Sequence, residues 1–145
     1  MNLFRRKQYC SGLLTGALIS FSLCFPAHAS KVVIDNIGPP KGNIVIALYA
    51  KQQDFFTSTN AIFSKTLPAQ DSRVEIELEN VPAGNYAVAG FHDVNGNGEL
   101  DIGGPFNTPI EPLIWGNNAS GTYGVPTFSA ARVFVEDSTH VYLTF

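Results

Sequence analysis

The chain has 145 residues, of which 45% are hydrophobic and 14% are charged, and this length and composition fit one globular domain with a packed core. Twelve acidic residues against nine Lys or Arg give a formal net charge of −3. An acidic domain is a poor binder of nucleic acid or anionic membrane surfaces, so neither is an expected partner.

The N-terminal segment has the three parts of a secretion signal. A basic group at 5–7 precedes an almost uncharged apolar stretch at 11–25, and Ala-His-Ala at 27–29 forms a small-x-small cleavage site. We therefore predict that residues 1–29 are a cleaved signal peptide and that residues 30–145 form a single exported domain. The mature domain is expected to be periplasmic or secreted, without membrane insertion.

Removal of the signal changes the chemistry of the remaining chain. Cleavage leaves 145 − 29 = 116 residues and removes both cysteines, Cys10 and Cys24, so no disulfide is expected despite the oxidising compartment. Six Lys or Arg then face twelve Asp or Glu, a formal charge of 6 − 12 = −6. Such a domain suits a cation as partner.

The first half of the mature chain reads as short strands separated by turns. Strands are expected at 32–37 and 42–51, and the second is apolar on both faces, which predicts a central position in a sheet. Residues 53–67 show no sustained period and are expected to be a packed connection with room for one short helical turn. A half-buried strand is expected at 73–79, because Val, Ile and Leu alternate there with Arg and Glu. The strand at 85–92 leads directly into a glycine-rich loop.

The second half combines one long irregular segment with two closing strands. Residues 102–129 contain four prolines and repeated Gly and Asn, but also too many aromatic residues for a disordered tail, so this loop is expected to fold back on the domain. Strands are expected at 131–136 and 140–145. About seven short strands and no convincing helix predict an all-β fold, an antiparallel β-sandwich with Greek-key connections.

The glycine-rich loop has the spacing of a calcium-binding loop. In the twelve-position loop of helix-loop-helix calcium proteins, positions 1, 3, 5 and 9 supply side-chain oxygens, position 6 is Gly and position 7 supplies a backbone carbonyl. The corresponding residues here are Asp93, Asn95, Asn97, Asp101, Gly98 and Glu99.

The loop departs from that pattern at position 12, where a bidentate glutamate is expected and Gly104 stands. A remote ligand or water must complete the coordination, and Glu111 is the candidate carboxylate. So few charges predict weak calcium binding, with Kd of ~10⁻⁴ to 10⁻³ M. A metal-free alternative stays open, because Asn95-Gly96 and Asn97-Gly98 are both common two-residue hairpin turns.

Three classes of function follow from these observations. The first is a non-catalytic exported domain stabilised by calcium. The second is a carbohydrate- or peptide-binding module whose aromatic platform would comprise Trp115, Tyr123 and Phe106, residues that could equally pack beneath the long loop. The third, an enzyme, is not expected: His92 and Asp93 are the only suggestive pair, and neighbours on a strand point to opposite faces.

Several runs of the sequence resemble one bacterial family. These are 80–88, 109–112, 115–119 and His-Asp-x-Asn-Gly-Asn-Gly-x-Leu-Asp at 92–101. Together they resemble the exported family catalogued as domain of unknown function 2141, across nearly the whole mature chain. The Pro-Ala-Gly-Asn-Tyr turn within 80–88 is also similar to that of transthyretin-like and carboxypeptidase regulatory-like sandwiches. The resemblance implies an exported β-sandwich and supplies no reaction.

Overall fold

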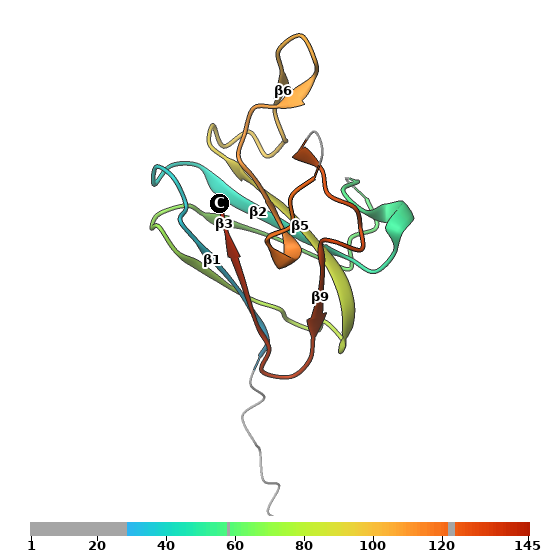
Figure 1. Ribbon diagram of the computed structural model, residues 1–145. Helices are drawn as coiled ribbons and strands as arrows, with labels where there is room; N and C mark the ends of the chain where they lie inside the picture. The colour runs from blue at the N-terminus through green and yellow to red at the C-terminus, as the bar shows by residue number, and fades with distance from the viewer. Residues whose placement is uncertain (1–28, 58, 122–123) are drawn as a thin grey trace, which may run out of the picture.

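The computed structural model describes residues 29–57, 59–121 and 124–145 (Figure 1). The predicted signal peptide therefore lies outside the described residues, except for Ala29. No helix in the described ranges is long and apolar enough to cross a membrane. The chain is all-β, as expected, and its regular elements are strands apart from two single 3-10 turns within those ranges.

The smaller of the two main sheets has three strands in the order β10-β1-β4. Strand β1 (Lys31–Asp35) pairs antiparallel with β4 (Val74–Glu77) and parallel with β10 (His140–Thr144). The other strand pairs of the described chain are antiparallel, as predicted, and the β1–β10 pair is the exception. Parallel neighbours need a long crossover, and here the rest of the domain forms it, because β1 and β10 are the first and last strands.

The larger sheet runs in the order β3-β2-β5-β8, and β9 also pairs with β5. Its central strands are β2 (Asn43–Tyr49) and the long β5 (Gly84–Asp93). Strand β3 (Phe63–Pro68) forms one edge. On the other side of β5, β9 (Arg132–Val135) pairs with its first half and β8 (Leu113–Trp115) with its second. The prediction that the second strand is central is confirmed.

Two of these strands fall where the sequence predicted irregular connections. In β3 the alternating positions are half-buried and exposed, and its Ser, Lys and Thr residues dilute the apolar pattern. Strand β8 has only three residues, between a proline and a glycine. With the two-residue strands β6 (Ile102–Gly103) and β7 (Thr108–Pro109), the described chain has ten strands rather than about seven.

Both sheets contribute side chains to a single main core. The alternation predicted for β4 is confirmed, because Ile76 is fully buried and Leu78 is 5% exposed, whereas Glu75 and Glu77 are exposed. Fully buried core side chains also come from β1, β2, β5 and β10: Val32, Ile34, Ile44, Ile46, Leu48, Val88 and Leu143. This shared core makes the two sheets a sandwich.

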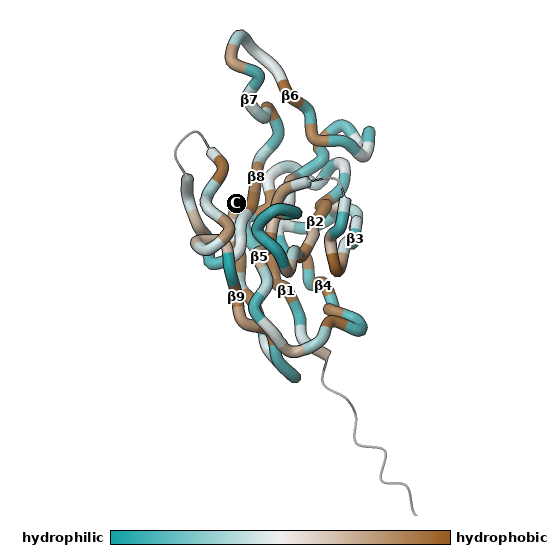
Figure 2. Tube along the Cα trace, turned by 90° about the vertical axis from the view of Figure 1, so that its right-hand side faces the viewer, coloured by the Kyte–Doolittle hydropathy of each residue, from teal (hydrophilic) through white to brown (hydrophobic). Residues whose placement is uncertain are grey.

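The β6–β7 hairpin lies apart from this sandwich. Figures 1 and 2 show it projecting beyond the ends of the sheets. Its side chains Ile102, Phe106 and Ile110 are 50%, 85% and 66% exposed. The chain returns to the larger sheet at β8, and beyond it Ala119 and Phe128 pack against the buried cluster around Trp115. The expectation that 102–129 folds back on the domain is therefore confirmed for β8 and for these later residues, whereas the hairpin extends into solvent.

An exposed ion pair between β1 and the segment before β4 gives the first testable prediction. Arg73 Nε and Nη2 donate to Asp35 Oδ1 and Oδ2 at 2.6 and 2.8 Å. This hydrogen bonding, assisted by the positive charge, holds the pKa of Asp35 below its usual 3.8. Ionised Asp35 therefore contributes stability above about pH 3.8, and that contribution is lost as pH falls through the lower folded-state pKa.

We expect Asp35→Asn to reduce the acid sensitivity of folding by a small amount, since exposed pairs are screened by solvent. The measurement is the urea midpoint of both proteins at about pH 6 and about pH 3, and the fall in midpoint between these two pH values should be smaller for Asp35→Asn. An equal fall in midpoint for both proteins would contradict this role of Asp35.

Candidate cation site in the 93–101 loop

The loop begins at a buried carboxylate at the end of β5. Asp93 is fully buried. Its Oδ1 accepts hydrogen bonds from the backbone N–H of Gly96 at 2.8 Å and Asn97 at 3.1 Å, and its Oδ2 accepts one from Gly98 N–H at 3.0 Å. Backbone donors thus compensate the burial of this charge. The sequence predicted Asp93 as a metal ligand, and its role in holding the loop backbone was missed.

Two asparagines continue the same backbone pattern. Asn95 Oδ1 accepts from Asn97 N–H at 2.9 Å, and Asn97 Oδ1 accepts from Glu99 N–H at 2.8 Å, so each forms an Asx turn. Gly96 and Gly98 have φ of +76° and +82°, whereas neither asparagine has a positive φ. A type I′ hairpin needs positive φ at both central residues. The loop is therefore not the two-residue hairpin that the Asn-Gly pairs also suggested.

The side chains of these asparagines converge on one carboxylate. Asn95 Nδ2 donates to Asp101 Oδ2, and Asn97 Nδ2 donates to Asp101 Oδ1 at 3.1 Å. Three of the residues predicted as cation ligands therefore meet at one place, where the amide nitrogens of the two asparagines face Asp101. Both hydrogen bonds lie at the exposed surface, where an ion from solvent can reach them.

Glu111 joins the two ends of the loop from a distant part of the chain. This carboxylate is 8% exposed. Its Oε1 accepts from Val94 N–H at 2.9 Å, and its Oε2 accepts from Asp101 N–H at 3.2 Å. Glu111 thus lies beside the loop, as the sequence reasoning required of a remote ligand, and its observed contacts are with backbone donors.

The residues present fit a weak site for a hard cation. Each side-chain oxygen of Asn95, Asn97 and Asp101 accepts one protein hydrogen bond, which leaves a second lone pair. None of the ion pairs within the described ranges involves Asp93, Asp101 or Glu111. Three carboxylates around one loop therefore lack a cationic partner in that part of the chain.

The same residues do not fit a strong or transition-metal site. Across the described ranges, no three His, Cys, Asp or Glu side chains lie close enough together to hold a metal. A cation here would depend on amide and backbone carbonyl oxygens as well as carboxylates. Such a ligand set suits calcium better than zinc or copper. Glu99 was expected to contribute only its backbone carbonyl, and its side chain is exposed.

The side chains of His92 and Asp93 contact different parts of the protein. His92 is 1% exposed, its Nε2 lies 2.7 Å from the backbone oxygen of Lys41, and its ring packs near Phe145. Asp93 binds the loop amides instead. The two side chains therefore do not form an acid–base pair, which agrees with the alternation expected along a strand.

The predicted aromatic platform is not brought together among the described residues. Trp115 is 5% exposed, and its ring centroid lies 4.8 Å from that of Phe56 and 5.8 Å from that of Phe55. Phe106, at 85% exposure, lies on the projecting hairpin. Tyr123 is outside the described residues. Trp115 is buried because β8 places it beneath the connection that follows β2.

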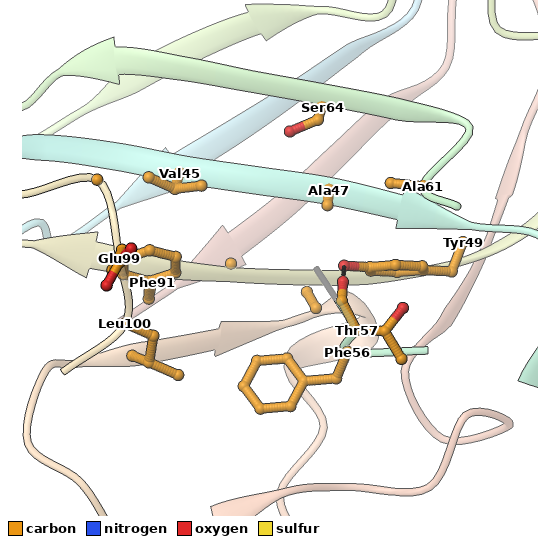
Figure 3. A pocket seen from close by; sticks show the side chains of 13 residues that line it. Val45, Ala47, Tyr49, Phe56, Thr57, Ala61, Ser64, Phe91, Glu99 and Leu100 are labelled. Carbon is orange, nitrogen blue, oxygen red and sulfur yellow. Dashed lines mark hydrogen bonds between the residues drawn. The ribbon is translucent and has the colours of Figure 1, made fainter. Parts of the chain in front are cut away.

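A cleft beside the loop was missed by the sequence reasoning. It lies on the face of the larger sheet opposite the main core, and Figure 3 shows its lining. Glu99 and Leu100 of the loop stand at one end, and Tyr49 and Thr57 at the other. The sequence signal for this cleft is the small size of Ala47 and Ala89, which lie on strands with larger apolar residues.

Comparison with known protein families gives a match over most of the described chain. A family model described as "Uncharacterized protein conserved in bacteria (DUF2141)" matches residues 32–142. No curated protein and no solved structure matches the chain. The finer likeness to transthyretin therefore stays a prediction.

Proposed function

The chain belongs to the bacterial DUF2141 family, and we propose that it is an exported, non-catalytic β-sandwich domain whose 93–101 loop binds one calcium ion. The observation that carries the calcium proposal is the convergence of Asn95 and Asn97 on Asp101, at the spacing of a calcium loop. Export is supported by the basic, apolar and Ala-His-Ala segments that open the sequence.

Asp101 is the residue on which the cation would depend most. Two neutral amide groups are its side-chain donors, and a cation would replace them with full positive charge. The side-chain oxygens of Asn95 and Asn97, the backbone carbonyl of Glu99 and the remaining lone pair of Asp93 complete the protein ligands. Calcium takes six to eight oxygens, so water would supply the rest.

The ion would act on structure rather than on signalling. Glu111 connects the loop to the segment that leads into β8, so a cation that orders the loop also stabilises this connection. With few charged ligands, Kd falls at ~10⁻⁴ to 10⁻³ M, the range of extracellular modules. Ambient calcium outside the cytoplasm would then occupy the site.

Thermal unfolding of the purified protein with excess calcium and with a chelator tests the proposal. Calcium at about a hundred times Kd adds ~2.7 kcal/mol, which raises the melting temperature by about ten degrees for a domain of this size. Asp101→Asn should abolish the rise while leaving the melting temperature in chelator nearly unchanged, because Asp101 is exposed at its contacts. Asp137→Asn, an exposed carboxylate elsewhere, is the control. An equal rise in the Asp101 variant would exclude this loop as the site.

A further inference from the structure

The cleft beside the loop has the size of a small-molecule site. Its volume is about 520 Å³, within the ~300–1,000 Å³ typical of ligand pockets. It lies on the outer face of the larger sheet, where β2 and β5 present the side chains that do not enter the main core.

The floor of the cleft is a row of small side chains across three strands. Ser64 of β3 is opposite Ala47 of β2, and Ala47 is opposite Ala89 of β5. The neighbouring row along the same strands holds the larger Val45 and Phe91. The small residues therefore leave a depression that is flanked by larger side chains.

One wall is held in place by a strained connection. Phe56 has a φ of +58°, a strained conformation that a bulky residue rarely adopts. Its ring is held against Trp115, with centroids 4.8 Å apart. Tyr49 Oη donates to the backbone oxygen of Thr57 at 2.7 Å, which fixes the adjoining residue. Strain held in this way is typical of segments shaped for a ligand.

The opposite wall is formed by the 93–101 loop and carries the charge. Gly98, Glu99 and Leu100 line it, and Glu99 is the sole ionisable side chain among the lining residues apart from Tyr49. Positive charge is absent from that lining, so an anionic ligand would have no cationic partner there and would be repelled by Glu99. The aromatic faces of Phe56 and Phe91 favour a flat ring and attract a cation.

From this lining we propose that the cleft binds a small molecule with a planar, largely apolar ring that is neutral or positively charged. The ring lies on the floor made by Ala47 and Ala89, beside Phe56 and Phe91. A polar or cationic substituent faces Glu99 at the rim. This goes beyond calcium binding, and the calcium proposal can fail while this one stands.

The test uses two probes that share a naphthalene ring and carry opposite charge, 1-naphthylmethylammonium and 1-naphthoate. Each is titrated into the full protein in calcium-containing buffer, and binding is followed by backbone amide chemical shifts. We expect saturable shifts at cleft residues, with the ammonium probe binding about tenfold more tightly, the effect of ~1.4 kcal/mol of charge interaction.

Variants separate the parts of the site. Ala47→Leu and Ser64→Leu each place a larger side chain on the floor of the cleft, and Ser64 is exposed, so its replacement should be tolerated. Each variant should weaken binding of the ammonium probe by about tenfold or more. Glu99→Gln should bring the two probes to nearly equal affinity, whereas Glu136→Gln, an exposed carboxylate on another strand end, should not. The amide spectrum of each variant verifies its fold.

Three results would overturn the proposal. They are the absence of saturable shifts at cleft residues with either probe, unchanged binding in a folded Ala47→Leu or Ser64→Leu protein, and tighter binding of naphthoate than of the ammonium probe. Loss of calcium binding in the melting experiment leaves these readouts unaffected, so the two proposals fail separately.

Discussion

Asp93→Ala is expected to destabilise the protein by about 3–5 kcal/mol, both with calcium and with a chelator. The buried carboxylate accepts three backbone N–H groups of the loop, and hydrogen bonds to a charged group contribute about 1.5–3 kcal/mol each, less than additively. Alanine removes all three acceptors. The measurement is chemical unfolding of both proteins in calcium and in chelator.

The matched comparison is Asp101→Asn, which alters the same loop at its exposed side. That variant should lose stability only when calcium is present. If Asp93→Ala also lost stability only in calcium, the carboxylate would act mainly as a metal ligand, and its role in holding the loop backbone would be wrong.

Gly42→Ala is expected to cost about 2–4 kcal/mol, the sum of an unfavourable backbone conformation and a steric clash. Gly42 has a φ of +74°, and a Cβ there would lie 1.9 Å from the backbone oxygen of Asp93. The start of β2 and the end of β5 would have to separate, which would also displace the first residue of the loop. Chemical unfolding measures the loss.

Gly104→Ala measures the cost of the unfavourable backbone conformation without a steric clash. Gly104 has a φ of +71°, almost the same as Gly42, but its added Cβ would meet no atom within 4 Å. Only about 1–2 kcal/mol is expected there. Equal losses in the two variants would show that close approach to Asp93 does not explain the need for glycine at 42.

The strands that were predicted from the sequence are those in which the order of apolar and polar residues matches the observed burial. Ile76 and Leu78 alternate with glutamates, and the doubly apolar 43–49 run lies in the middle of a sheet. Strand β3 was not predicted because polar residues interrupt its apolar pattern, and β8 was not predicted because three residues are too few to show a period. The parallel β1–β10 pair joins residues too far apart for any local pattern to report it.

The sequence indicated which residues share the candidate loop, but not the contacts that they make there. Spacing indicated that Asp93, Asn95, Asn97 and Asp101 belong to one loop, and the search for a remote carboxylate led to Glu111, which lies beside it. The direction in which each oxygen points depends on the loop backbone. The cleft depends on the register that aligns three small residues across β3, β2 and β5, which strand patterns alone do not fix.

A calcium titration followed by backbone amide resonances tests the central claim most directly. Gly96 and Gly98 N–H groups both donate to Asp93, so they report on the loop itself. We predict saturable shifts of these resonances with one calcium per chain and Kd of ~10⁻⁴ to 10⁻³ M. The shifts should be lost in Asp101→Asn and kept in Asp137→Asn. Resonances that stay unmoved through millimolar calcium, or that shift equally in Asp101→Asn, would contradict a calcium site in the 93–101 loop.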